Sequence, residues 1–391
     1  MKLFPKLFYL GVLIFSVAFL FIGNRIATDG LVTPDAGDDA NMVPAVVTQI
    51  IDRVEDQHQI SPEFTLTNIS ITFGARITGG ELSGQEITAL HNLSTMALIM
   101  EKEVEVGDRI LLFYDAFNSQ YFFANYIRIN YILILAIAFL VLMVLFGRLK
   151  GFNAIVALGF ICLAIFLVFI PAILAGINIY LATIIVCAYA IISTLLIVVG
   201  PNKKALSSIL GCLGGVLLAG LLVFFMDIIL NLTGMIDDET PMLLLLPTEN
   251  PINLRAIIFA GVTIGAVGAI MDVAMSIASS LWEVKQAGAK ADFSSILKSG
   301  VNIGKDILGT MLNTLILAYI GSSLSLILLI SAHATSLTLL FNTEMVIVEL
   351  LRALVGSFGI LLTIPLTAAI CGWLYSQHEA GEAKQHGKYG I

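Results

Sequence analysis

The sequence has little charge and little cysteine for its length. Only 12% of its 391 residues are charged, about half the roughly 25% of a soluble domain, and 58% are hydrophobic. Its four cysteines stand alone in apolar runs, which excludes a disulfide framework and a CxxC metal or redox site. A net charge of −8 argues against a nucleic-acid partner, because phosphate binding needs clustered lysine and arginine. These absences leave a membrane protein whose main partner is the lipid bilayer.

The common motifs of enzymes are also missing. The sequence contains no HExxH motif for metal-assisted proteolysis, no GxxxxGK[ST] phosphate loop and no GxSxG nucleophile elbow. We therefore expect no enzymatic activity, no catalytic residues, no cofactor and no metal site.

Eight apolar segments are predicted to span the membrane. A span needs about 20 apolar residues, because about 30 Å of hydrocarbon is crossed at 1.5 Å per residue. The uncharged stretch 151–202 is long enough for two spans, which Pro171 to Asn178 separate. The short run 242–246 cannot cross and is predicted to lie at the outer interface. The predicted spans are 7–22, 129–146, two within 151–202, 206–230, 256–281, 307–330 and 350–375.

Basic residues give the orientation of these spans. Twelve lysine and arginine residues flank the predicted inner ends, and only Arg25, Arg128, Arg255 and Arg352 flank the outer ends. Because positive charge is retained in the cytoplasm, both termini are predicted to be cytoplasmic. The first segment is interpreted as an uncleaved anchor, with a signal peptide as the alternative.

The segment between the first two spans is predicted to be an extracytoplasmic β domain. It holds more than half of the acidic residues and begins with an acidic linker, 24–41. Residues 43–51, 64–73 and 109–114 are rich in Val, Ile, Thr and Phe, and glycine turns separate them, which indicates a small antiparallel barrel or sandwich. His58 and His91 stand alone in the sequence, so a spacer or binding domain is favoured over a catalytic one.

The predicted fold class is therefore an α-helical polytopic membrane protein of about eight transmembrane helices, with a small all-β domain after the first helix. Its domains are an anchor (1–23), the β-rich domain (24–128), a seven-helix membrane domain (129–376) and a cytoplasmic tail (377–391). Apolar residues at helical spacing in 293–301 indicate either a helix on the inner membrane surface or a connector packed on the bundle.

Polar residues inside predicted spans are the candidates for function, because an acid at the centre of a span costs about 2.5–3.5 kcal/mol on insertion scales. Asp272 lies well inside its span, with Ser276 on the same helical face and Gly261, Gly265 and Gly268 above it. It is interpreted either as a group that carries a ligand, proton or ion, or as a hydrogen-bond partner of Asn313 or Thr310 in the next span.

Two further polar groups accompany Asp272. Asp306, Thr310 and Asn313 follow the i, i+4, i+7 pattern of one helical face. Glu349 and Arg352 are predicted to form an ion pair at the outer boundary. In contrast, Gly211, Gly215 and Ala219 form a small-xxx-small stripe that is interpreted as helix packing.

The same residues resemble a known family. Segments 268–279, 304–315 and 318–321, together with Glu349, Arg352 and 356–357, are similar to the YibE/F family of bacterial membrane proteins. The resemblance covers roughly residues 129–376. It implies a multi-pass protein of the bacterial plasma membrane, sometimes found with a related YibE/F-type subunit, and it implies no established activity.

The sequence therefore predicts a permease or an ion- or proton-coupled secondary transporter for a small molecule or ion, with Asp272, Ser276, Asp306, Thr310, Asn313, Glu349 and Arg352 as its polar core. The alternative is a membrane scaffold or sensor that transports nothing. In that alternative the outer domain binds a partner and the polar stripes only hold helices together.

Overall fold

A computed structural model describes residues 4–28, 42–61, 64–94, 102–237, 239–246, 248, 250–286, 292–333 and 336–386. Its contacts divide the chain into two compact units. One comprises residues 33–143 and contains a β-barrel, and the other comprises residues 1–32 and 144–391 and is helical.

The β unit confirms the predicted barrel and corrects its strands. Its five described strands are β1 (Met42–Ser61), β2 (Phe64–Ile77), β3 (Glu86–Ser94), β4 (Arg109–Asp115) and β5 (Gln120–Tyr126), which close a barrel in the order β1-β2-β3-β5-β4. Not all pairs are antiparallel, because β3 and β5 run parallel. Strand β3 was missed although its inward positions alternate, because one of them is a histidine, His91. This side chain is 2% exposed and packs against Phe123, with 4.0 Å between the ring centroids.

An exposed ion cluster on the barrel makes its stability depend on pH. Arg53 donates to Glu103 at 2.8 and 3.0 Å and to Glu55 at 3.0 Å. Hydrogen bonds from Gln57 and Arg53 hold the pKa of Glu55 below its usual range, and the bond from Arg53 does the same for Glu103. A lowered pKa means that these carboxylates stabilise the fold above the unfolded-state pKa of about 4.3, and that this stabilisation is lost as the pH falls through the folded-state pKa.

We therefore expect residues 42–126, expressed alone, to fold cooperatively and to lose melting temperature on acidification. The barrel has its own apolar core, which includes Val47, Phe73, Ile110 and Leu112. Circular dichroism during heating, at neutral pH and near pH 3, measures the change. Glu103→Gln should show a smaller acid effect, and an equal effect in both proteins would show that the Arg53 cluster is not its cause.

Seven described helices are long and apolar enough to cross a membrane. They include α1 (Phe4–Thr28), α4 (Ile179–Val198), α5 (Lys203–Leu230), α6 (Leu254–Gln286), α7 (Phe293–Ser322) and α10 (Glu344–His386). The seventh comprises α2 (Ile129–Ala164), the π-helix η3 (Ile165–Phe169) and α3 (Ile170–Leu174). The remaining short helices are η4 (Thr240–Leu245), α8 (Leu324–His333) and α9 (Leu337–Leu340).

The count of seven differs from the predicted eight because two predicted spans lie in one helical stretch. That stretch, Ile129–Leu174, has 46 residues, and its helix is broken at Arg148, which has φ 48 and ψ −128. The predicted division at Pro171 to Asn178 is confirmed in its later part, because α3 continues through Pro171 to Leu174 and α4 begins at Ile179. There Gly176 has φ +75, and the Asn178 side chain accepts a hydrogen bond from the Leu181 N–H at 3.1 Å to start α4.

Helix α7 corrects one sequence expectation and favours one of two alternatives for another. Predicted span 307–330 is not one helix, because α7 ends at Ser322 and α8 begins at Leu324. The amphipathic segment 293–301 is the first part of α7, and Ile296 is buried in the bundle core. The structure thus supports the packed connector instead of a helix lying on the membrane surface.

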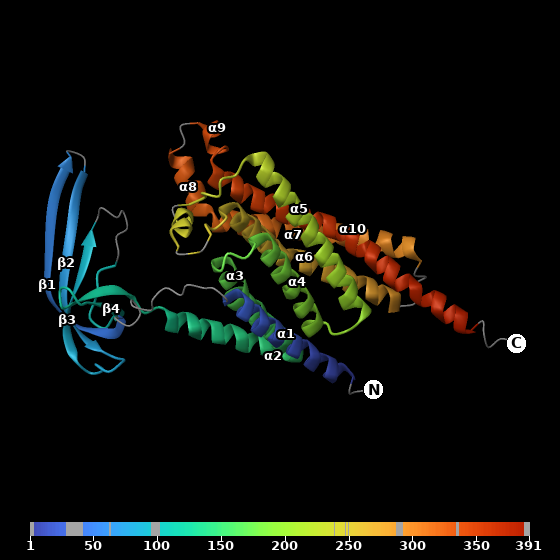
Figure 1. Ribbon diagram of the computed structural model, residues 1–391, viewed down its shortest axis with the longest axis horizontal. Helices are drawn as coiled ribbons and strands as arrows, with labels where there is room; N and C mark the ends of the chain where they lie inside the picture. Colours follow the sequence, from blue (N-terminus) through green and yellow to red (C-terminus); the bar gives the residue numbers. More distant parts are fainter. Residues whose placement is uncertain are drawn as a thin grey trace. The chain divides into compact units, whose positions relative to one another are not determined.

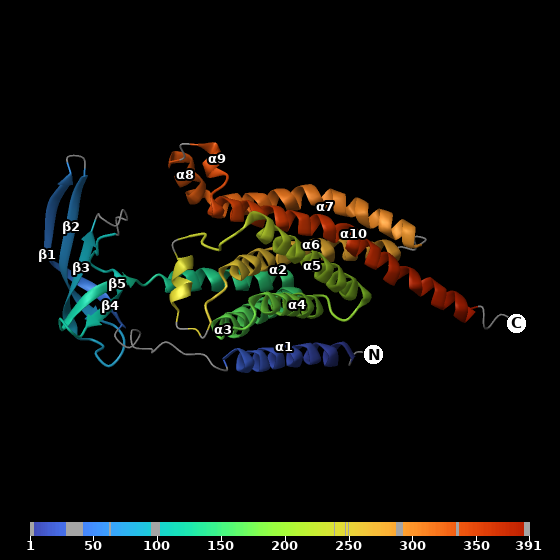
Figure 2. The same cartoon turned by 45° about the horizontal axis from the view of Figure 1, so that its top comes forward.

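The core of the helical unit lies where α5, α6, α7 and α10 pack together, as Figures 1 and 2 show, with α4 beside them and α1 next to α4. Glycines allow the close contacts. Gly215 of α5 lies against Thr363 of α10, and Gly211 lies against Thr367. Both threonines are completely buried. The α5 stripe is therefore a packing surface, as predicted from its spacing.

Candidate functional site

Asp272 lies near the middle of α6 on the exposed side of that helix. Gly261, Gly265 and Gly268 are exposed on the same side, one to three turns nearer the α6 N-terminus. The opposite side of α6 is buried and includes Ile270 and Ala274. The helical spacing predicted from sequence therefore holds, and it places the carboxylate on the outside of this chain.

Two contacts between α6 and α7 show which residues of α7 lie at the same height along the helix axis as Asp272. A Cβ atom on Gly265 of α6 would lie 3.2 Å from the hydroxyl oxygen of Tyr319 of α7. A Cβ atom on Gly300 of α7 would lie 3.0 Å from Cδ1 of Leu281 of α6. The two helices run in opposite directions, so counting residue for residue from either contact puts Asp272 level with residues 309–312 of α7. The polar groups of α6 and α7 therefore share one level.

The polar residues of α7 also face outward. Asp306, Thr310 and Asn313 are all exposed, and the Thr310 hydroxyl donates within its own helix to the Ile307 carbonyl at 2.9 Å. In the described part of the chain, Asp272 forms no hydrogen bond with Thr310 or Asn313. The interpretation of Asp272 as a partner of these residues is thus not what the structure shows.

Open space surrounds this level of both helices. Nothing lies within 4 Å of the positions that a Cβ would take on Gly268 of α6 and Gly309 of α7. We call the exposed set the polar face, and it consists of Gly268, Asp272, Asp306, Gly309, Thr310 and Asn313. Ser276 lies one turn beyond Asp272 and is half-buried.

A second polar group lies near the N-terminal end of α6 and the C-terminal end of α7. Arg352 Nη1 lies 2.6 Å from Glu349 Oε1, which confirms the predicted ion pair. The Ser323 hydroxyl, between α7 and α8, donates to Glu349 Oε2 at 2.8 Å. The position that a Cβ on Gly261 would take is 4.0 Å from Arg352 Nη2, so the ion pair lies against the glycine-lined side of α6. Ser323 was missed because the apolar residues before Gly321 and after Ser325 led to the prediction of one continuous span, 307–330.

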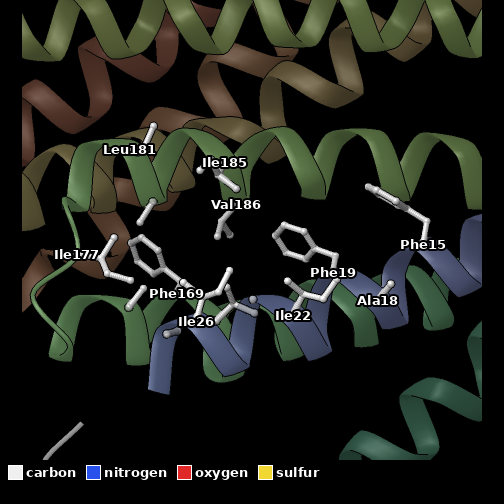
Figure 3. A pocket seen from close by; sticks show the side chains of 15 residues that line it. Phe15, Ala18, Phe19, Ile22, Ile26, Phe169, Ile177, Leu181, Ile185 and Val186 are labelled. Atoms are coloured by element: carbon white, nitrogen blue, oxygen red, sulfur yellow. The ribbon is translucent and has the colours of Figure 1, made fainter. Parts of the chain in front are cut away.

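Two apolar pockets of the helical unit lie elsewhere. An apolar cavity of about 430 Å³ separates α1 from α4 beside the π-helix η3, and in Figure 3 Phe19 and Ile22 of α1 face Ile185 and Val186 of α4 across it. A second cavity of about 610 Å³ lies among α4, α5 and α6 and is also mostly apolar. Neither includes any residue of the polar face, so Asp272 lies on an open surface.

The described residues offer no evident metal centre. Among them, no three His, Cys, Asp or Glu side chains come close enough together to hold a metal ion. Within this part of the chain the polar face has the two carboxylates of Asp272 and Asp306, amide and hydroxyl groups, and glycines that leave room beside them. Such an arrangement can bind a proton, a cation or a polar side chain from another helix.

Comparison with known proteins gives one clear match. No curated protein and no solved structure matches the chain significantly. Residues 135–377, more than half of the chain, match the family model described as YibE/F-like protein. The match includes every residue of the polar face and the Glu349–Arg352 pair. Together with the seven apolar helices it indicates a membrane protein, and the chain belongs to the YibE/F-like family.

Proposed function

We propose that this protein is a permease or an ion- or proton-coupled secondary transporter of the bacterial plasma membrane. The observation that carries the proposal is a carboxylate in the middle of an apolar helix, Asp272, which has no hydrogen-bond or ion-pair partner in the described residues. An acid at such a position costs about 2.5–3.5 kcal/mol on insertion, and such groups commonly mark ion pathways and proton relays.

The surroundings of Asp272 support a path along α6. Gly261, Gly265 and Gly268 line the side that leads from Asp272 to the Glu349–Arg352 pair. In the other direction, Ser276 lies one turn away. Polar groups thus follow one side of α6 from the Glu349–Arg352 pair to its middle. In this proposal both termini are cytoplasmic and the barrel is extracytoplasmic.

A scaffold or sensor is the second candidate, and one observation favours it. The polar face is open to the outside of the chain instead of lining an enclosed cavity, which is typical of a surface that another helix covers. In this candidate a related YibE/F-type subunit covers the face and the barrel binds a partner outside the cell.

Proteoliposomes loaded with a pH-sensitive dye separate the two candidates. Gradients of sodium, potassium, magnesium or manganese ions serve as probes, and the internal pH is the readout. We expect at least one gradient to drive proton movement in the wild type. Asp272→Asn should abolish it, because the amide keeps the shape of the side chain but cannot bind or release a proton.

Glu283→Gln is the matched control, since it removes a carboxylate from the exposed end of the same helix. This variant should retain most of the wild-type flux. Flux in Asp272→Asn at the wild-type rate from about pH 5 to pH 8 would rule out Asp272 as the carrier. Wild-type vesicles that move protons no faster than empty vesicles with any probe would favour the scaffold.

A further inference from the structure

Helix α7 is both polar and poorly buried, and these two properties conflict in a membrane helix that only lipid covers. It is the least hydrophobic of the seven candidate spans, yet only 6% of its most apolar stretch is buried, against 33% for α10 and 56% for α6. A membrane helix with polar residues normally turns them toward the bundle interior, because lipid offers them no hydrogen bonds. Something other than lipid must therefore cover the outside of α7.

The packing of α7 fixes which residues face outward. Gly300 lies against Ala368 of α10, and Gly304 lies against Ile364, so a turn of α7 about its axis would push side chains into α10. This contact leaves a row of exposed polar residues on the other side. In order along the helix they are Asn302, Lys305, Asp306, Thr310 and Asn313.

We propose that this side of α7 is an interface with α7 of a second copy of the same chain. The proposal concerns assembly and does not depend on whether the protein transports anything. If it does, the second copy completes the surroundings of Asp272, which lies level with residues 309–312 of α7.

The chemistry of the exposed row matches a two-fold interface. Such an interface brings a surface against its own copy, so its groups must complement themselves. An asparagine amide both donates and accepts, and Asn313, which has no hydrogen bond to the described residues, can pair with its own counterpart. Gly309 has open space beside it, which lets the backbones of two helices approach closely.

Charge gives a second reason for choosing an identical partner. Lys305 and Asp306 are neighbours of opposite sign, both are exposed, and neither has an ion-pair partner among the described residues. Two parallel α7 helices place Lys305 of each copy beside Asp306 of the other. An apolar helix would leave these charges and Asn313 without partners.

Disulfide cross-linking in native membranes tests the interface directly. Cys162→Ala removes the one exposed native cysteine, and the other three are buried. In that background, Asn313→Cys should form a disulfide-linked dimer of the chain when oxidised. The matched control is Leu361→Cys, at an exposed position near the middle of the apolar part of α10, which should stay monomeric.

A second measurement reports the strength of the interface. Asn313→Leu should weaken dimerisation by about threefold to thirtyfold, as expected for the loss of one interhelical hydrogen bond. Energy transfer between labelled copies at increasing lipid dilution measures the dimerisation. Leu361→Ala should leave it unchanged. Because the first test uses a different variant, poor folding of Asn313→Leu would not prevent a decision.

Three outcomes would overturn the proposal. One is a monomeric wild type at every lipid dilution, with Asn313→Cys labelled by a water-soluble thiol reagent, which would show a water-filled path. Another is cross-linking of Asn313→Cys only to a different protein, which would show a related subunit on this face. The third is equal cross-linking at Asn313 and Leu361, which would show random collision.

Discussion

Replacing Gly215 with leucine should leave no folded helical unit, and replacing it with alanine should lower the free energy of unfolding by about 2 kcal/mol. The reason is the closeness of α5 and α10. A Cβ on Gly215 would overlap the Thr363 Oγ1 atom and would lie 3.1 Å from Ile270 Cγ2. Thr363 is completely buried and donates to the Gly359 carbonyl at 2.6 Å, so its hydroxyl cannot move without losing that bond.

The size of the alanine effect is a balance of known terms. Overpacking a tight core costs about 1–3 kcal/mol, and the lost hydrogen bond costs about 1 kcal/mol more. Alanine recovers up to about 1 kcal/mol because it favours a helix over glycine. For a unit of this size the net change corresponds to a melting temperature lower by about 5 °C, measured by heating the purified protein in detergent.

Two controls separate packing from a general effect of substitution. Gly220→Ala changes the same helix, but its Cβ would meet Phe259 Cζ at an ordinary 3.5 Å, so we expect a neutral or slightly stabilising change. Thr363→Ala should rescue Gly215→Ala, because it removes the overlapping atom. A strictly additive double mutant would show that the two side chains do not meet.

Much of the helical unit was predictable because apolar length is a strong local signal. The uncharged stretch 151–202 predicted two helices, and the structure divides it between Leu174 and Ile179, within the predicted break. The end of α7 at Ser322 has a weaker signal. Gly321, Ser322 and Ser323 favour a turn, but apolar residues continue through α8, and 307–330 was therefore predicted as one span.

The polar residues of the candidate site were predictable from the sequence, but the side of the bundle that they face was not. Helical spacing correctly put Asp306, Thr310 and Asn313 on one side of a helix. Periodicity does not say which neighbour that side meets. The direction of α7 depends on Gly300 and Gly304, whose missing side chains admit α10. Because of these tertiary contacts Asn313 is exposed on the outside of the bundle, and no hydrogen bond joins it to Asp272.

Two strands of the barrel, β3 and β5, were not predicted, because the prediction relied on apolar content and not on the alternation of apolar and polar residues. Strand β5 (Gln120–Tyr126) has polar residues at both ends and strand β3 has a buried histidine, so neither is a continuous apolar run. Both nevertheless pair with neighbours over several residues. The closed barrel needs both strands, because β5 joins β3 to β4.

The second large effect is expected at Glu344, the first residue of α10. Its carboxylate accepts hydrogen bonds from the Thr233 N–H at 2.8 Å, the Thr233 hydroxyl at 2.7 Å and the Gly234 N–H at 2.7 Å. These bonds attach the segment after α5 to the start of α10. Gly234 has φ +94 and lies against the backbone of Leu254, so the segment has little freedom to find other partners.

Glu344→Ala should therefore lower the free energy of unfolding by about 3 kcal/mol, since each hydrogen bond to a charged group contributes about 1.5–3 kcal/mol and water replaces part of the loss. An acid at a helix N-terminus adds about 0.3–1 kcal/mol through the helix dipole. Glu344→Gln should fall between alanine and the wild type, because the amide keeps only one acceptor oxygen. Thermal unfolding in detergent measures all three proteins.

Glu283→Ala provides the comparison, since Glu283 is exposed and makes no hydrogen bond with the described residues. Its effect should stay within about 0.5 kcal/mol. If Glu344→Ala is no less stable than Glu283→Ala, the three hydrogen bonds do not hold α10 to the segment after α5. If Glu344→Gln is as unstable as Glu344→Ala, the charge of Glu344 matters more than its geometry, because glutamine fills the same space without the charge.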